Sequence, residues 1–228
     1  VALMCNLYSL NKGQAAIIAF TRALRDSTGN LPILPGIFPD YKAPVVANKG
    51  GIRELCMMRW GMPSSQKAQL DAATKRADNL RAKGKEIDFK ELLRMEPDTG
   101  TTNIRNTASK HWKRWLGIEN RCVVPFTSFS EFNKAEGGDI WFALDESRPL
   151  AVFAGIWTNW TSVRKVKEGE TTNDLFGAAF GNALYVLCYL ASIFASMSLF
   201  DASTKFRLRI LAPAYVSLLI LALALGTW

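Results

Sequence analysis

The chain has 228 residues, enough for one medium domain with an appendage or for two small domains. Its formal net charge of +8 at pH 7 favours an acidic partner, either nucleic acid or an anionic membrane surface. Four widely spaced cysteines and a single histidine argue against a zinc site and a disulfide framework, and they fit a reducing cytosol. We therefore expect no metal and no small-molecule cofactor.

The N-terminal quarter predicts a short strand, a helix and a β-hairpin. Residues 14–25 follow a strand-like start and carry apolar side chains at helical spacing. The apolar face of this helix is expected to hold Ala15, Ile18, Ala19 and Ala23. A loop with turn-forming prolines then leads into two strands, Ala43–Ala47 and Glu54–Trp60. The pair Gly50-Gly51 between these strands predicts a hairpin turn.

The middle of the chain predicts a surface insertion followed by more strands. Residues 65–95 place a few apolar side chains among many charged ones, which is typical of two exposed amphipathic helices. Three later segments have the β-branched and aromatic content of strands, namely Arg121–Phe129, Ile140–Leu144 and Leu150–Trp157. The first domain is therefore predicted to be α+β, with a substantial mixed or antiparallel sheet.

The C-terminal part of the chain differs from the rest in having few charges. Leu175–Phe200 is 26 residues without a charge and Ile210–Trp228 is 19 more, so both reach the length of about 20 apolar residues that spans a bilayer. We predict a hydrophobic helical hairpin over residues 177–228, with two candidate transmembrane helices. The alternatives are a buried hydrophobic hairpin of a soluble protein and a tail that comes from a wrong reading frame or a fusion.

Cations lie on both sides of the first candidate span. Those on the expected cytosolic side are Arg164, Lys165 and Lys167. Those in the turn between the two spans are Lys205, Arg207 and Arg209. Because cytosolic loops normally carry the excess of Lys and Arg, these two groups work against each other and do not decide the orientation.

The dipeptide Met4-Cys5 is a candidate reactive site. An initiator Met before a small residue is normally removable, which leaves a free α-amine beside the Cys5 thiol. The amine can condense with an aldehyde, and the thiol then closes a five-membered thiazolidine ring. Both groups have reference pKa values of about 8 to 8.5, so a reactive fraction of each exists near pH 7. An internal cysteine cannot form this ring, so the chemistry requires that residues 1–4 are absent from the mature chain.

Met4-Cys5 is the first of five motifs that occur in one order. The others are Pro35-Gly36-x-Phe38-Pro39, Arg59-Trp60-Gly61-Met62-Pro63, Asn103-Ile104-Arg105-Asn106-Thr107, and Arg121-Cys122-Val123-Val124-Pro125 followed by Ser130-Glu131-Phe132. With this order the chain from Met4 to about Phe176 resembles the SOS response-associated peptidase (SRAP) family, the abasic-site processing proteins. Residues 64–98 correspond to a family-variable insertion. The resemblance implies a mainly β, open-barrel domain with peripheral helices over residues 4–176.

The resemblance also implies roles for four residues. Cys5 matches the family's catalytic N-terminal cysteine, which links to the aldehyde of an abasic site in single-stranded DNA. Asn103 matches an asparagine that orients the DNA-linked cysteine, and Arg105 matches an arginine that contacts a DNA phosphate. Glu131 matches the active-site glutamate, a proton shuttle during Schiff-base formation and ring closure that is also linked to removal of the initiator Met.

Two aromatic residues and one histidine complete the site predictions. Trp60 and Phe38 are candidates to stack on bases beside the lesion, as aromatic side chains do in single-strand grooves; the alternative is that both are core aromatics. The family's catalytic histidine has no counterpart downstream of Asp174. The single histidine, His111, follows the Asn103 motif and is predicted to be a surface or half-buried residue.

These features predict a DNA-damage protein that senses abasic sites in single-stranded DNA and forms a covalent thiazolidine crosslink through Cys5. Autopeptidase removal of Met4 and β-elimination (lyase) activity would accompany this reaction. The catalytic domain is expected in the cytoplasm, tethered to the inner membrane by the C-terminal hairpin. The alternative is a membrane-anchored or truncated module that binds single-stranded DNA without chemistry.

Overall fold

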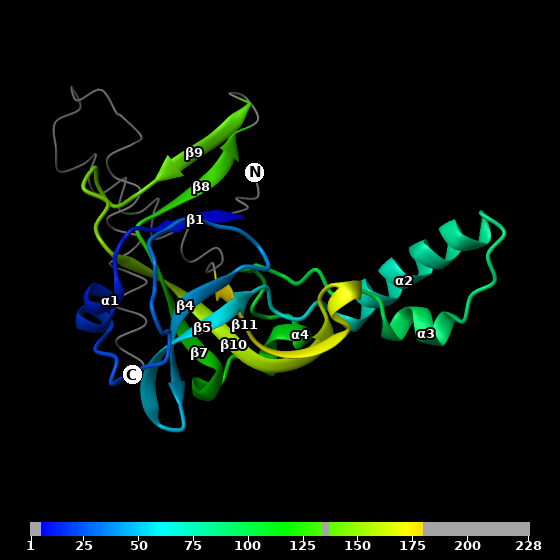
Figure 1. Ribbon diagram of the computed structural model, residues 1–228, viewed down its shortest axis with the longest axis horizontal. Helices are drawn as coiled ribbons and strands as arrows, with labels where there is room; N and C mark the ends of the chain where they lie inside the picture. The colour runs from blue at the N-terminus through cyan, green and yellow to red at the C-terminus, as the bar shows by residue number, and fades with distance from the viewer. Residues whose placement is uncertain (1–5, 134–136, 180–228) are drawn as a thin grey trace.

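The computed structural model describes residues 6–133 and 137–179 (Figure 1). These residues form two β-sheets, several short helices and a helical arm that projects from the sheets. The predicted α+β class is confirmed, and strands are its main component.

The smaller sheet is antiparallel and contains the N-terminal strand as an inner strand. In sheet order its strands are β3 (Leu34–Ile37), β1 (Leu7–Leu10), β8 (Ser128–Asn133) and β9 (Gly138–Phe142). β1 pairs with β8 through Leu7↔Ser130 and Tyr8↔Phe129. β1 is therefore paired with the strand that carries Glu131.

The larger sheet is mixed and closes on itself. In sheet order its strands are β2 (Arg25–Asp26), β5 (Ile52–Trp60), β4 (Lys42–Lys49), β7 (Arg121–Phe126), β10 (Ala151–Val163), β11 (Glu170–Ala179) and β6 (Asn103–Ile104). β11 also pairs in parallel with β5, through Leu175↔Arg59 and Phe176↔Trp60. Within the described residues this short pairing completes a ring of β5, β4, β7, β10 and β11, so the barrel that the resemblance implied to be open is closed here.

The β4–β5 hairpin and the first helix show where local sequence signals succeed and fail. Gly50 and Gly51 form the predicted turn with φ angles of 61° and 81°, which glycine adopts without strain. Helix α1 (Gln14–Thr21) forms but ends four residues before the predicted end, because Arg22 takes a left-handed conformation and Arg25 joins β2. The buried residue of α1 is Ile17. Ala15 and Ala19, which were predicted to lie on the apolar face, are exposed, because the sheet contacts another side of the helix.

The core fills the ring with aromatic side chains. Trp60 is 1% exposed and stacks on Phe176, with 6.3 Å between ring centroids, while Tyr8 meets it edge-on at 5.0 Å. Phe126 and Phe153 stack at 3.8 Å. A second cluster packs α4 (Lys110–Lys113) onto the barrel through Met62, Ile104, Trp112, Trp115, Ile156 and Leu175. Short 3₁₀ turns, η1 (Ile118–Asn120) and η2 (Val166–Glu168), precede β7 and β11.

The predicted insertion forms the projecting arm, here defined as residues 64–98 (Figure 1). It contains α2 (Gln66–Arg81) and α3 (Phe89–Arg94). The Ser65 hydroxyl and the Asp88 carboxylate cap the two helices by accepting hydrogen bonds from backbone N–H groups in their first turns. The prediction of two exposed helices is confirmed. The caps and the contacts at the base of the arm stabilise these helices.

The C-terminal end of the described chain corrects one predicted boundary. β11 continues to Ala179, so residues 177–179 are strand rather than the start of a helical hairpin. Ala178 pairs with Asn103 and is buried. The apolar character of these residues is therefore that of a buried strand. The rest of the predicted hairpin, residues 180–228, lies outside the described residues. None of the helices in the described part of the chain has the length and apolar character needed to cross a bilayer.

Candidate functional site

The chain that follows Cys5 enters the fold beside the Asn103 motif. The Thr102 hydroxyl donates a hydrogen bond of 3.4 Å to the Asn6 side-chain oxygen. One residue later, β1 begins and Leu7 pairs with Ser130, the residue before Glu131 in β8. Segments that are about 100 residues apart in the sequence therefore meet at the residue after Cys5. Cys5 itself lies outside the described residues.

The Asn103 segment is held by main-chain bonds from the barrel. The Thr102 carbonyl accepts hydrogen bonds from the Trp60 indole N–H at 3.2 Å and from the Ala178 N–H at 3.0 Å. Thr101 and Met62 exchange two further main-chain bonds, of 2.9 and 2.8 Å. This segment leads into β6, where Asn103 is half-buried and Ile104 is fully buried. The backbone before Asn103 is thus fixed from three directions.

The predicted site residues come from β6, the segment that follows it, and β8. Asn103 lies in β6, Arg105 follows it with a partly exposed side chain, and Glu131 is half-buried in β8. Sequence reasoning missed Asn6 and Thr102, whose contact joins the N-terminal segment to the Asn103 motif. Neither residue type carries a signal of its own, and only their position beside motif residues could have indicated them.

The two predicted base-stacking aromatics have different environments. Trp60 is buried and offers no ring face to a base, so the prediction that it stacks on DNA is wrong and its alternative as a core aromatic holds. Its indole instead supports the Asn103 segment through the Thr102 carbonyl. Phe38 is 45% exposed and packs edge-on against Tyr41, itself 56% exposed, with 5.6 Å between ring centroids. Phe38 therefore has a ring that solvent reaches.

A charged cluster lies behind the turn that carries Phe38. Arg59 donates two hydrogen bonds of 2.7 Å to the Asp40 carboxylate, and Arg164 donates a third of 3.1 Å. Partial burial by itself would raise the pKa of Asp40, but these hydrogen bonds and the two positive charges outweigh it and lower that pKa below its ordinary value. Asp40 is therefore ionised at neutral pH and fixes the turn through two arginines.

His111 serves the packing of α4. Its Nε2 lies 2.9 Å from the Pro63 carbonyl and its Nδ1 lies 3.1 Å from an Arg114 nitrogen. Its ring also meets Trp112 and Trp115 edge-on. Both ring nitrogens therefore have a polar neighbour. The side chain is half-buried, in agreement with the prediction of a surface or half-buried residue.

The buried cysteines are poor nucleophiles. Burial raises the pKa of the Cys56 thiol to about 11, although Lys49 nearby acts in the opposite direction. Burial also raises the pKa of Cys122, which is completely enclosed. Both thiols therefore stay protonated at neutral pH and are poor nucleophiles.

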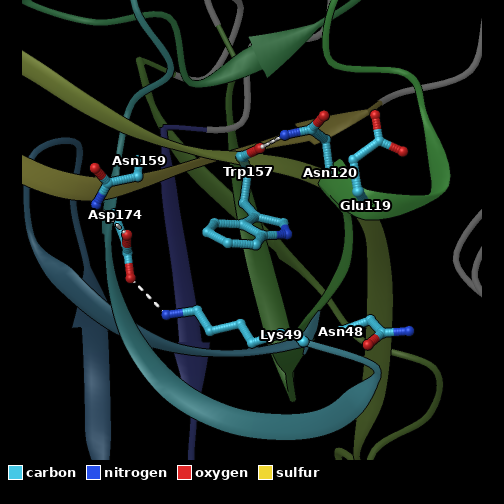
Figure 2. Close-up of a pocket in the computed structure, with 8 residues that line it drawn as sticks. Asn48, Lys49, Glu119, Asn120, Trp157, Asn159 and Asp174 are labelled. Carbon is cyan, nitrogen blue, oxygen red and sulfur yellow. Dashed lines mark hydrogen bonds and ion pairs between the residues drawn. The ribbon is translucent and has the colours of Figure 1, made fainter.

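A shallow depression of about 480 Å³ lies away from the predicted site residues, around Trp157 (Figure 2). Its polar side chains mainly bond to one another. Asp174 accepts hydrogen bonds from Lys49 at 2.5 Å and from Asn159 at 2.8 Å, and Asn120 donates to the Trp157 carbonyl. The Lys49 ammonium also lies 5.1 Å from the centre of the Trp157 ring. Lys49 is thus engaged within the protein.

Comparison with known proteins agrees with the arrangement of motifs. The family model described as SOS response associated peptidase (SRAP) matches residues 4–176. Two crystal structures from Bordetella bronchiseptica are similar: a protein at 18% identity and TM-score 0.48, and a phage-related protein at 13% identity and TM-score 0.45. Each comparison covers 78% of this chain, and 73% and 69% of the other chain respectively. No curated protein matches. The chain belongs to the SOS response associated peptidase (SRAP) family.

Proposed function

We propose that this protein recognises abasic sites in single-stranded DNA and traps them covalently through Cys5 once Met4 has been removed. The observation that carries the proposal is the meeting of three motif-bearing segments at Asn6. The Asn6 side chain contacts Thr102, next to Asn103, and β1 pairs with the strand of Glu131 from the following residue onward. Because Cys5 is bonded to Asn6, these contacts support a shared site for the proposed nucleophile and the residues proposed to assist it.

The chemistry begins with the ring-opened sugar of an abasic site, which presents an aldehyde. The Cys5 α-amine adds to the aldehyde carbon, and loss of one water gives a Schiff base. The Cys5 sulfur then adds to the imine carbon, and the thiol proton ends on the nitrogen, which completes a thiazolidine ring. Glu131 is proposed to take the proton that the amine loses and to return it to the departing hydroxyl, a role typically worth about 10² to 10⁴ in rate.

Removal of Met4 must come first, because the amine is otherwise part of a peptide bond. Hydrolysis of the Met4–Cys5 bond consumes one water and releases both the Met4 residue and any residues before it. We propose that the same carboxylate, Glu131, assists this autopeptidase step. The Schiff base can also lose the 3′ phosphate by β-elimination, which gives a lyase side reaction in competition with ring closure.

DNA binding is proposed to involve the partly exposed Arg105 and the exposed ring of Phe38. A guanidinium binds phosphate through two parallel N–H donors, and an exposed aromatic ring stacks on bases of any sequence. Asn103 is proposed to orient the cysteine once it is linked to DNA. The family histidine has no equivalent here, so steps that resolve the crosslink are expected to be slow.

The test uses protein translated from Met4, mixed with a single-stranded oligonucleotide that contains one abasic site. We expect a heat-stable band of reduced mobility, no such band with an intact oligonucleotide, and no band with Cys5→Ala. Glu131→Gln should form the adduct at least about 10²-fold more slowly. Protein molecules that mass spectrometry shows to retain Met4 should not form it. If Cys5→Ala forms the adduct as fast as the parent, the proposal is wrong.

The same experiment separates the proposal from a non-catalytic binding module. A module of that kind would bind the oligonucleotide reversibly and release it at high salt, with no adduct after heating. The engagement of the single histidine in packing, at Pro63 and Arg114, is the observation that favours this second reading.

A further inference from the structure

Arg164 has an environment that is unusual for an arginine at the end of a strand. It directly follows β10, and its side chain is 0% exposed. Its guanidinium lies against Asp40, with Nη2 at 3.0 Å and Nε at 3.1 Å, and its Nη1 donates to the Gly61 carbonyl at 3.2 Å. A buried guanidinium needs such partners to offset the loss of hydration.

Two glycines form a slot for this guanidinium. A Cβ added at Gly61 or at Gly100 would lie 2.7 Å from an Arg164 nitrogen, closer than real contacts allow. The φ angles are 135° at Gly61 and 74° at Gly100, which favour glycine at both positions. The Gly61 Cα would also lie 3.0 Å from a Cβ added at Gly100, so the two backbones pass close together at the guanidinium.

The slot lies between the two segments that bring proposed DNA-contacting residues to the site. Gly100 is three residues before Asn103, and its N–H donates to the buried Asp98 carboxylate at 2.8 Å. Asp40 is two residues after Phe38 and adopts a φ angle of 71°, which is uncommon for a residue other than glycine. Arg164 contacts both the Gly100 segment and Asp40. Its side chain therefore connects the segment that leads into Asn103 with the turn that carries Phe38.

We propose that Arg164 is a positioning residue for the proposed reaction, because it sets the distance between the Phe38 turn and the segment that leads into Asn103. This inference rests on the proposed function. Arg164 does not touch the reacting atoms; it acts through Gly61, Gly100 and Asp40. A planar guanidinium suits this task because its donors point in fixed directions, whereas a lysine ammonium in the same slot would bind one partner at a time.

The first test compares Arg164→Lys with the parent in the crosslinking reaction. We expect the rate at saturating oligonucleotide to fall about tenfold, because a small displacement of reacting groups has effects of this order or larger. The oligonucleotide concentration at half-maximal rate should rise by a smaller factor than the rate falls, because Arg105 and Phe38 are still present, although their spacing changes. Arg94→Lys, an exposed arginine on the arm that pairs with Glu91 and Glu170, is the matched control and should behave as the parent.

The second test measures the slot without reference to DNA. Hydrogen exchange of the peptides that cover residues 36–41 and 98–106 should become faster in Arg164→Lys, while peptides of β7 and of the β10 centre keep their parent rates. Gly100→Ala should have the same local effect. Gly84→Ala is its control, since Gly84 has a nearly identical φ angle of 71° with nothing near the added Cβ.

Each outcome decides the inference. Parent-like exchange and crosslinking in Arg164→Lys would show that Arg164 positions nothing, and faster exchange throughout the barrel would show a role in general stability only. A half-maximal concentration that rises as the saturating rate stays constant would make Arg164 a determinant of binding instead. If the parent forms no adduct at all, the proposed function fails, and parent-like local exchange in Arg164→Lys and Gly100→Ala would then reject the positioning role as well.

Discussion

Phe38 and Trp60 show how much the environment of one aromatic side chain decides. Both come from motifs that precede the Asn103 segment, yet Phe38 is 45% exposed and Trp60 is 1% exposed. An exposed ring can stack on a base, whereas a buried indole that donates to a backbone carbonyl stabilises the protein. The two residues should therefore respond to substitution in opposite ways.

We predict that Phe38→Ala weakens reversible binding of single-stranded DNA with little change in thermal stability. Base–aromatic stacking is worth about 1 to 3 kcal/mol, which corresponds to a loss in affinity of roughly five- to 150-fold. Fluorescence anisotropy with a labelled oligonucleotide measures this directly. Tyr41→Ala, which removes the neighbouring exposed ring, shows whether the effect is specific to Phe38.

Trp60→Ala should instead lower the free energy of unfolding by about 3 to 5 kcal/mol, the usual range for a buried Trp. An affinity loss in Trp60→Ala protein that is still folded and equally stable would contradict this assignment.

The predictability of the elements from sequence depends on whether their cause is local. The β4–β5 turn and the two arm helices were predictable, because Gly50-Gly51 and the charged helical pattern act over a few residues. The buried face of α1 was not, because contacts with distant strands select Ile17. Nor was the burial of Trp60, whose stacking partner Phe176 is more than 100 residues away and reaches it through the pairing that closes the barrel.

The candidate site also has a part that could be predicted from local sequence and a part that depends on distant contacts. Its motif residues could be named from their order along the chain. The contacts that join them could not, because Asn6, Thr102 and Arg164 have common side chains whose partners come from other elements. The apolar residues after Asp174 were assigned to a helix because apolar length alone does not separate a buried strand from a helix, and pairing with Asn103 decides for strand up to Ala179.

The arm provides a test at the scale of elements. Its buried residues are Ala73 and Ala77 in α2 and Glu96 and Asp98 at its base, where Asp98 accepts hydrogen bonds from the backbone of Ser64 and Gly100. Replacement of residues 79–91 by a short Gly-Ser linker should leave the unfolding temperature nearly unchanged, since loop length has a weak effect on stability. Asp98→Ala should lower it by several degrees, because two backbone donors lose their acceptor at a cost of about 1 to 3 kcal/mol. Differential scanning calorimetry measures both unfolding temperatures. If the linker variant lost more than Asp98→Ala, the distal half of the arm would be part of the core.

At the scale of the whole molecule, the ion pairs predict how stability depends on pH. The pKa values of Asp40, Glu54 and Asp174 are lowered in the folded protein, because hydrogen bonds and neighbouring cations outweigh the effect of burial. A carboxyl group with a lowered folded pKa stabilises the protein above its unfolded pKa of about 4 and loses that contribution as the pH falls through the folded value.

We therefore expect these groups to make a nearly constant contribution to the free energy of unfolding between about pH 5 and 7, where they are ionised in both states. Below about pH 4 their contribution should fall. Urea titrations at several pH values measure this. Asp40→Asn should reduce the slope below pH 4, whereas Glu91→Gln, in an exposed pair with Arg94, should not, because solvent screens such pairs. An unchanged slope in Asp40→Asn would show that Asp40 is not held by Arg59 and Arg164 in solution.

The proposed crosslink through Cys5 is tested most directly by identifying the residue that is linked to DNA. Protein translated from Met4 is reacted with abasic single-stranded DNA, digested with protease and nuclease, and analysed by tandem mass spectrometry. We expect Met4 to be absent and the DNA remnant to be on the N-terminal Cys5, attached through both nitrogen and sulfur. A mature chain that retains Met4, or a remnant on a lysine or another cysteine, would contradict it.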